Sequence, residues 1–290
     1  MIPDSRTGVA AFKHETRAQW DDAAAGWDKH GPEIRNWLCI PTDAMMEMAG
    51  IGPGQSVLDV AAGAGDQTLD IAERVGATGA VVATDISAGI LEYARENADR
   101  AGHRNVRIHV ADAADLALED AKFDAAVCRL GLMFLPDPLA GLTEIHRVLK
   151  PGGRFCSIVF AGPDMNPCLR ILMATATRHA GIAPRDPFQP GGLVSLGKPG
   201  LMDDLFQRAG FRAVATTRMD CPFRLPTTAD YLNFIRDSAR PILQMLASLD
   251  DARRAAAWAD IAAQLEVYQT AEGWIGPNAL LLTLGQRCGL

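Results

Sequence analysis

The stretch VLDVAAGAGDQT, Val57–Thr68, gives the first strong indication of how this chain folds. It begins with a short apolar run, Val57–Val60, which predicts a strand buried on both faces. The run passes into small residues, with Gly63 and Gly65 two positions apart, and then into a helical pattern over Asp66–Val75. A strand, a turn with almost no side chains and a helix are typical of a nucleotide-binding site, because a ligand can approach the backbone there and the helix N-terminus offers unpaired N–H groups.

Strand and helix patterns continue to alternate after this stretch. Ser87 is a suitable cap for the next helix and Gly102 a suitable stop. Alternation of this kind predicts a mostly parallel sheet with right-handed crossovers. The further strands are predicted at Ala80–Asp85, Val106–Val110, Phe123–Leu130 and Arg154–Phe160, and a helix at Leu139–Leu149 is expected to be broken by Pro151-Gly152-Gly153.

The pattern predicts four regions along the chain. Residues 1–50 are expected to form an N-terminal helical cap, and residues 51–160 the α/β core. Residues 161–278 are expected to supply lid and substrate-binding insertions together with a sixth strand, and residues 279–290 the final strand of the sheet. The elements predicted there are helices at Met165–Ala180, Leu201–Ala209 and most of Thr228–Gly273 (capped at Asp250 or Asp251), strands at Phe211–Asp220 and Ala279–Gln286, and a Pro- and Gly-rich lid loop at Gly181–Gly200.

Composition limits the classes of partner. The 290 residues carry a formal net charge of -7, which argues against a general nucleic-acid surface or a polybasic membrane anchor. The six cysteines form no C-x-x-C pair, so neither a zinc site nor a dithiol redox site is predicted, and free thiols suit a reducing compartment. No signal-peptide core and no apolar run of about 20 residues is found, so we expect a cytoplasmic protein without a membrane span.

Three ligand classes compete for the glycine turn. The string G-x-x-x-x-G-K-[ST] of a phosphate-binding P-loop is absent. A dinucleotide turn, G-x-G-x-x-G, is matched by Gly63 and Gly65, but its third glycine falls on Thr68, and Asp66 places a negative charge where a pyrophosphate would lie. S-adenosylmethionine (SAM) has no phosphate and carries a cationic sulfonium, so it is favoured. A nicotinamide-dependent reductase is kept as an alternative.

Acidic residues follow the next two predicted strands. Asp85 ends the second strand, where a carboxylate can accept hydrogen bonds from both hydroxyls of a ribose, in NAD and in SAM alike. Asp112 ends the third strand, where a carboxylate can accept from an adenine amino group. A single acid at a strand end can equally be a helix cap or a solvated loop residue, but two acids behind a glycine turn are harder to dismiss.

Together these segments resemble the motifs of class I SAM-dependent methyltransferases. The likeness covers about Gly50 to Phe160 and is most similar to the ubiquinone/menaquinone-biosynthesis (UbiE-like) type of small-molecule methyltransferase. The resemblance implies a Rossmann-like seven-stranded sheet whose last strand is antiparallel, with SAM as cofactor. The segments that carry it are Val57–Thr68, Thr84–Ser87, Ala111–Leu116, Phe123–Pro136 and Leu149–Phe155 (LKPGGRF).

The resemblance also implies roles for single residues. Cofactor contacts are expected from ten positions, and Ala61 departs from the glycine that many members have there. Gly63 and Gly65 would pass beside the methionine end, Asp85 would bind the ribose with Ile86 against the adenine, Asp112 and Ala113 would read the adenine edge, and Arg129 would border the methionine moiety. The full set is Trp27, Ala61, Gly63, Gly65, Gln67, Asp85, Ile86, Asp112, Ala113 and Arg129.

The residues that would handle the acceptor are less well defined. Trp20 and Trp27, seven apart, share one helical face, and Trp27 could face the sulfonium or simply pack in the core. His14, His30 and His179 lie in segments expected to cover the site and are weak candidates for a general base. The expected reaction is in-line methyl transfer to O, N or C of a small, apolar or aromatic acceptor. A SAM-binding protein without transfer activity and a homodimer both remain open.

Overall fold

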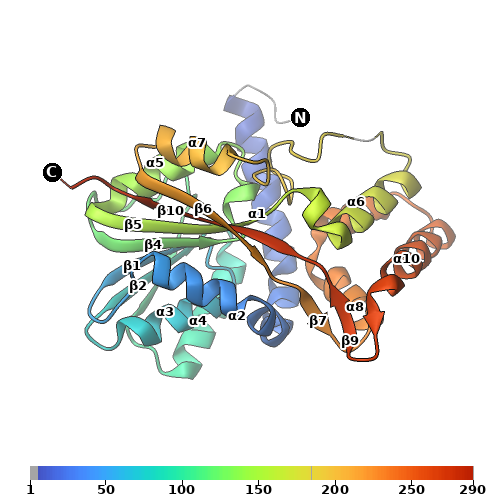
Figure 1. The fold of residues 1–290 in the computed structure, drawn as a ribbon, viewed down its shortest axis with the longest axis horizontal. Coiled ribbons are helices and arrows are strands. Elements are labelled where there is room, and N and C mark those ends of the chain that lie inside the picture. The colour runs from blue at the N-terminus through green and yellow to red at the C-terminus, as the bar shows by residue number, and fades with distance from the viewer. Residues whose placement is uncertain (1–5, 184, 290) are drawn as a thin grey trace.

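A seven-stranded sheet forms the centre of the molecule, which is a computed structural model that describes residues 6–183 and 185–289. Its strand order is β3-β2-β1-β4-β5-β10-β6, and β10 runs antiparallel to both of its neighbours (Figure 1). This arrangement confirms the predicted fold class. The strands are β1 (Ser56–Val60), β2 (Ala80–Asp85), β3 (Val106–Val110), β4 (Phe123–Arg129), β5 (Leu149–Phe160), β6 (Arg212–Asp220) and β10 (Ala279–Gln286).

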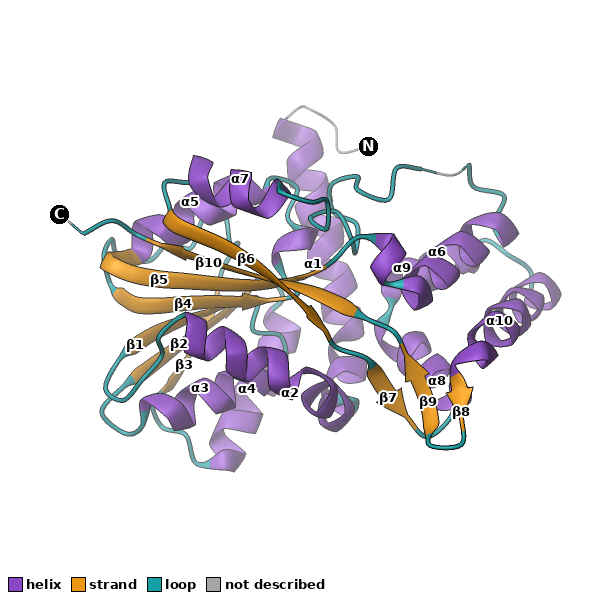
Figure 2. Ribbon diagram, viewed as in Figure 1, coloured by secondary structure: helices purple, strands orange, loops and turns teal. Residues whose placement is uncertain are grey.

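Helices cover the sheet and extend beyond one of its ends (Figure 2). The two N-terminal helices confirm the predicted helical character of residues 6–48, whereas residues 1–5 lie outside the described part of the chain. None of the helices described combines the length and apolar character needed to cross a bilayer. The helices are α1 (Arg6–Lys29), α2 (Gly31–Met48), α3 (Asp66–Val75), α4 (Ala88–Ala101), α5 (Pro138–Val148), α6 (Pro167–His179), α7 (Leu201–Arg208), α8 (Thr228–Ser238), α9 (Arg240–Ala247) and α10 (Asp251–Leu265), with single 3₁₀ turns at Leu132–Phe134, Pro163–Met165 and Glu266–Tyr268.

Local capping explains where several helices begin and end. The Ser87 hydroxyl accepts the Ile90 N–H at 3.0 Å, and Gly102 ends α4 with a φ of 78°. The Asp250 carboxylate accepts the Arg253 N–H at 2.8 Å at the start of α10. These predicted caps are confirmed.

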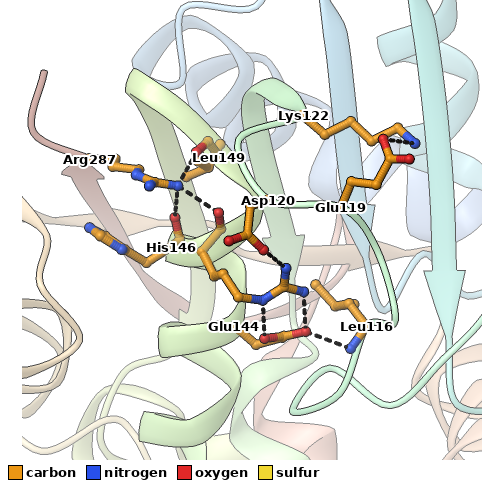
Figure 3. A network of polar contacts seen from close by, with 9 residues as sticks. Leu116, Glu119, Asp120, Lys122, Glu144, His146, Leu149 and Arg287 are labelled. Atoms are coloured by element: carbon orange, nitrogen blue, oxygen red, sulfur yellow. Dashed lines mark hydrogen bonds and ion pairs between the residues drawn. The ribbon is translucent and has the colours of Figure 1, made fainter. Parts of the chain in front are cut away.

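A charged side chain closes the C-terminal end of α5. Arg287, just after β10, donates from Nη1 to the carbonyl oxygens of His146 at 3.1 Å and Leu149 at 2.5 Å, and to that of Arg147 at 2.6 Å (Figure 3). The carbonyls of His146 and Arg147 belong to the last turn of α5, where they have no partner within the helix and a cation is favoured beside them. The last strand is thereby fastened to the helix that precedes β5.

Two sequence predictions differ from the structure. The fifth strand was predicted to begin at Arg154, after a break at Pro151-Gly152-Gly153. In the structure, β5 already begins at Leu149 and includes these three residues, and its register opposite β4 is irregular. The helical prediction over Thr228–Gly273 is wrong at its end, where β8 (Gln269–Thr270) and β9 (Gly273–Gly276) join β7 (Phe223–Leu225) in a second small sheet.

The second sheet is held by a contact that local sequence does not reveal. Trp274 of β9 is fully buried, stacks on Tyr231 with ring centroids 4.2 Å apart, and donates its Nε1–H to the Leu265 carbonyl at 3.0 Å. This sheet lies with α6, α8 and α10 beyond the end of the large sheet (Figures 1 and 2).

Candidate active site

The glycine turn closes onto the neighbouring strand. The N–H of Gly63, whose φ is 58°, donates to Asp85 Oδ2 at 3.1 Å, and the Ser87 N–H donates to Asp85 Oδ1 at 3.0 Å. The pairing of β1 with β2 brings these residues together, because both strands end at the same edge of the parallel sheet. This is also where the strand order reverses between β1 and β4, the place where ligands bind in open α/β sheets.

A cavity of about 530 Å³ lies in front of this turn. Nine of the ten predicted cofactor residues line it, and Gly65 is the one that does not. They come from the ends of β1, β2, β3 and β4, and from α1 and α3. The nine are Trp27, Ala61, Gly63, Gln67, Asp85, Ile86, Asp112, Ala113 and Arg129.

Gly65 is a glycine for a different reason. Its φ is 86°, and a Cβ there would lie 2.9 Å from both Cα and Cβ of Ala94 on α4. Gly65 therefore allows α3 to begin close to α4, on the side of the turn that packs against this helix.

Ala61, at the first glycine position of the family motif, has a left-handed backbone conformation that glycine adopts more easily. Ala61 has a φ of 55°, and Leu130, at the end of β4, has a φ of 58°. Both line the cavity. Beside them Gly131 packs so tightly that a Cβ would lie 2.4 Å from the Ala61 Cβ. Left-handed non-glycine residues are uncommon and gather at binding sites. Leu130 and Gly131 were not predicted, because only pairing of β1 with β4 brings them to Ala61.

Asp85 is chemically suited to a ribose. Each of its oxygens accepts one backbone N–H and retains lone pairs toward the cavity. The protein packed around it raises the pKa of Asp85 to about 6, chiefly by burial, and Asp21 on α1 adds a smaller effect in the same direction. Two hydroxyl donors would compensate this desolvation.

A second buried carboxylate fixes the first turn of α3. Asp59, fully buried in β1, accepts Gln67 Nε2 and Thr68 Oγ1, both at 2.6 Å. Burial raises its pKa to about 6. Thr68, where a dinucleotide motif would need glycine, is thus a buried structural residue. Asp59 was not singled out from sequence, although an acid inside an apolar strand was a visible signal.

The charge at the start of α3 is paired, which corrects part of the sequence argument. Arg129 donates to Asp66 Oδ2 at 2.6 Å and to Thr42 Oγ1 at 2.8 Å, and its side chain is 7% exposed. Asp66 alone therefore does not exclude a phosphate by repulsion. The Arg129–Asp66 pair does match the zwitterionic methionine end of SAM, because the guanidinium can face its carboxylate and the Asp66 carboxylate can face its ammonium. With Asp85, these residues fit SAM.

The N-terminal helix covers the cavity, and its polar contacts were not predicted. Lys13 Nζ lies 2.5 Å from Asp112 Oδ2, and Arg17 Nε donates to the Ile86 carbonyl at 3.1 Å. Asp21 Oδ1 accepts from the Ser87 hydroxyl at 2.5 Å. These contacts hold α1 across the ends of β2 and β3.

A second cavity, of about 270 Å³, adjoins the first. The two share Phe12, Thr16, Trp20, Trp27, Leu130 and Phe134. Of the described residues that line the second cavity, Glu15 is the one acidic or basic side chain, and nine of the others carry aromatic rings. The rings are Phe12, Trp20, Trp27, Trp37, Phe134, Phe160, Phe223, Tyr231 and Phe234.

The structure places the three candidate histidines outside both cavity linings. His14 is exposed on α1. His30 Nε2 lies 2.9 Å from Asp237 Oδ2, and His179 Nε2 lies 2.8 Å from Asp260 Oδ2, so both rings are engaged in hydrogen bonds to carboxylates of other helices. We therefore carry none of them forward as a general base. Within residues 6–183 and 185–289, no group of His, Cys, Asp and Glu side chains gathers in a way that could hold a metal ion.

Comparison with known sequences agrees with this geometry. The sequence profile of the ubiE/COQ5 methyltransferase family matches residues 37–174. A 2-phytyl-1,4-naphtoquinone methyltransferase from Nostoc sp. is 35% identical over 157 residues, which cover 52% of this chain and 67% of that protein. The chain belongs to this family. A demethylmenaquinone methyltransferase from Staphylococcus aureus is 37% identical over 121 residues, covering 42% of this chain and about half (49%) of that relative.

Solved structures share the fold at lower identity. The YcgJ protein from Bacillus subtilis has a TM-score of 0.56 at 19% identity, covering 86% of this chain and 98% of its own. Phosphoethanolamine N-methyltransferase 2 from Haemonchus contortus, solved with S-adenosylhomocysteine, has a TM-score of 0.55 at 16% identity, covering 90% and 57%. The likeness extends to the [4+2]-cyclase SpnF (TM-score 0.54, 19% identity, 93% and 97%), so the fold alone does not name the reaction. Family membership does, and this chain is a SAM-dependent methyltransferase.

Proposed function

We propose that this methyltransferase acts on an apolar ring compound of the quinone type that occupies the aromatic second cavity. The observation that carries the proposal is the chemistry of that cavity, which is lined by aromatic rings, has Glu15 as its one charged lining residue, and borders the cofactor cavity. A charged acceptor would lose hydration against this mostly apolar lining, in which Glu15, exposed on α1, is the one charged partner. The names of the relatives, a naphthoquinone and a demethylmenaquinone methyltransferase, support the same class.

The residues of the first cavity would hold the cofactor by both ends. Asp85 would accept the ribose hydroxyls, and the Arg129–Asp66 pair would meet the zwitterionic methionine end. When bound, SAM would supply an activated methyl group for transfer to the acceptor, with S-adenosylhomocysteine and the proton of the acceptor atom as the other products. Asp112 and Ala113 would lie at the adenine edge, as the family resemblance implies.

The rest of the catalytic work would be orientation and exclusion of water. Trp20, Trp27 and Phe134 lie in both cavity linings and would keep the acceptor ring beside the cofactor. Helix α1, fixed by Lys13 and Asp21, would shield the reacting centre from solvent. Correct placement of two reactants contributes a large part of such rate enhancements, with effective molarities of roughly 10⁵–10⁸ M in well-oriented systems.

An acceptor screen scored by release of S-adenosylhomocysteine tests this proposal. We expect hydroxylated naphthalenes and benzenes to be turned over, with kcat/KM at least about 100-fold above that of phosphoethanolamine, because burying the charged amine is costly. SAM binding should be measured alongside by calorimetry.

Three results would contradict the proposal in different ways. Turnover of the polar amine in preference to the ring compounds would remove the acceptor class. SAM binding with no product from any acceptor would favour a SAM-binding protein without transfer activity. Enhancement of NADH fluorescence on mixing, with no binding of SAM, would favour the nicotinamide-dependent reductase.

A further inference from the structure

An amide in the second cavity is left without a hydrogen-bond partner. Asn278 lies between β9 and β10, is 9% exposed, and lines the second cavity but not the first. Its Oδ1 is buried and has no partner among the described residues. Buried polar atoms in folded proteins are nearly always paired, so an unpaired amide oxygen on a residue that lines a cavity indicates a ligand group that completes it.

The backbone around Asn278 is held firmly on both sides. Its carbonyl accepts the Cys221 N–H at 2.7 Å, and the next residue, Ala279, donates its N–H to Asn166 Oδ1 at 3.0 Å. Asn166 is fully buried and donates back to the Ala279 carbonyl at 3.1 Å. The side chain of Asn278 is therefore presented from a fixed backbone, which suits a residue that positions a ligand.

Two neighbouring polar groups in this cavity are already engaged. The Trp37 indole donates to the Cys221 carbonyl at 2.9 Å and stacks on Phe223 with ring centroids 4.7 Å apart. The Ser238 hydroxyl donates to the Phe234 carbonyl at 2.6 Å. Trp27 Nε1, at the border of the two cavities, is buried and unpaired like Asn278 Oδ1. Asn278 Oδ1 and Trp27 Nε1 are thus the two buried side-chain polar atoms of this lining that have no partner among the described residues.

We propose that Asn278 Oδ1 accepts a hydrogen bond from a hydroxyl group on the acceptor ring and so acts as a positioning and specificity-determining residue. An amide oxygen accepts only, so its partner must be a donor. A neutral hydroxyl suits this mostly apolar lining, in which Glu15, exposed on α1, is the one charged side chain among the described residues. This inference rests on the proposed ring-compound acceptor and identifies the side chain that binds its hydroxyl group.

Binding to the protein saturated with S-adenosylhomocysteine tests this role without requiring turnover. The probes are 1,4-naphthalenediol and 1,4-dimethoxynaphthalene, which share the ring but differ in hydroxyl donors. We expect the wild type to bind the diol roughly 10-fold more tightly, because the ether leaves the buried amide oxygen unpaired. In Asn278→Leu, close in size, the ratio should fall to about twofold or less.

Two further variants act as controls. Asn278→Asp keeps an acceptor and should keep the preference for the diol. Asn233→Leu makes the same exchange on an exposed part of α8 outside both cavity linings, and should leave the ratio at the wild-type value. Thermal melting and the affinity for S-adenosylhomocysteine report whether each variant is folded.

The outcomes separate this inference from the proposed function. An unchanged ratio in folded Asn278→Leu, or equal affinities in the wild type, overturns the role of Asn278 while leaving the ring acceptor intact. Binding of neither probe by protein that binds S-adenosylhomocysteine overturns the ring acceptor and this role together. If Asn278→Leu does not fold, Asn278→Asp decides, because loss of the diol preference in that variant contradicts the role.

Discussion

Two acids at the edge of the sheet show how burial changes the properties of side chains near the site. Asp85 and Asp59 are both acids whose pKa is raised to about 6 by burial, yet they have different tasks. Asp59 is satisfied by Gln67 and Thr68 and anchors α3. Asp85 is satisfied only by backbone N–H groups and still faces the cavity, so it is the acid with capacity left for a ligand.

The raised pKa of Asp85 predicts that cofactor affinity depends on pH. In the protein without cofactor, the pKa of Asp85 is about 6 rather than the ordinary 3.8, so its neutral form prevails below pH 6. The protonated Asp85 contributes to the stability of the folded state, and this contribution is lost as pH rises from about 4 to 6. The ionised form accepts two ribose hydroxyls. We therefore expect SAM affinity to fall by up to about 10-fold per pH unit below pH 6 and to be flat above pH 7.

Calorimetry at pH 5, 6, 7 and 8 checks this dependence. Asp85→Asn should bind SAM roughly 10- to 100-fold more weakly at pH 8, because a hydrogen bond to a charged group is lost. Asp59→Asn removes the neighbouring acid that also has a pKa of about 6, and should leave the pH dependence of SAM affinity unchanged. Constant wild-type affinity from pH 5 to 8 would contradict the assignment.

Two glycines with similar φ values allow the effect of packing to be separated from the effect of backbone strain. Gly65→Ala should destabilise the protein by about 2–4 kcal/mol, because the new Cβ meets Ala94 and the φ of 86° is strained. Gly152→Ala, with a φ of 83° and no atom within 4 Å of the new Cβ, should cost only about 1 kcal/mol. Urea unfolding gives both values. Equal losses would mean that Gly65 serves only the turn conformation.

At the level of elements, polar side chains fasten helices to the sheet. Lys13, Arg17 and Asp21 hold α1 over the ends of β2 and β3, while Arg287 joins the end of β10 to the end of α5 (Figure 3). Neither attachment follows from a local pattern. Both place a charged side chain next to backbone groups or an oppositely charged residue.

Arg287→Ala should weaken the attachment of the last strand. We expect a loss of about 1–3 kcal/mol in the free energy of unfolding, because carbonyls at the end of α5 lose a charged donor. Arg212→Ala, at an exposed position at the start of β6, is the matched control and should change stability by less than about 0.5 kcal/mol. Equal effects of the two variants in urea unfolding would show that the contact to α5 does not stabilise the fold.

At the level of the whole molecule, two cavities meet at one aromatic border. The sheet edge lines the cofactor cavity, and segments before, within and after the core line the other, including Gly191 and Leu193 of the loop predicted as a lid. Cofactor binding and acceptor binding should therefore respond to different substitutions.

Leu193→Trp tests this separation. The larger side chain should occupy part of the 270 Å³ cavity and raise the acceptor KM by roughly 10-fold or more, while the Kd for SAM stays within about twofold. Leu193→Ala changes volume in the opposite direction and should not exclude the acceptor. A parallel loss of SAM affinity in Leu193→Trp would show that the cavities act as one.

The sequence by itself determined the elements that depend on near neighbours in the chain. Apolar runs predicted the core strands, and Ser87 and Asp250 predicted helix starts. The glycine turn with Asp85 predicted a nucleotide-type ligand, and the family resemblance indicated SAM. The resemblance supplied the antiparallel strand β10, because strand order depends on long-range pairing that no local pattern encodes.

Only the tertiary structure decided how distant groups combine. It paired Arg129 with Asp66, buried Trp274 to form the second sheet, and brought Asn278 to a cavity that α1 also lines. Strand and helix preferences act over a few residues, whereas ion pairs and cavities need contacts between segments far apart in sequence. For this reason the cofactor could be predicted from a series of local motifs, and the acceptor site could not.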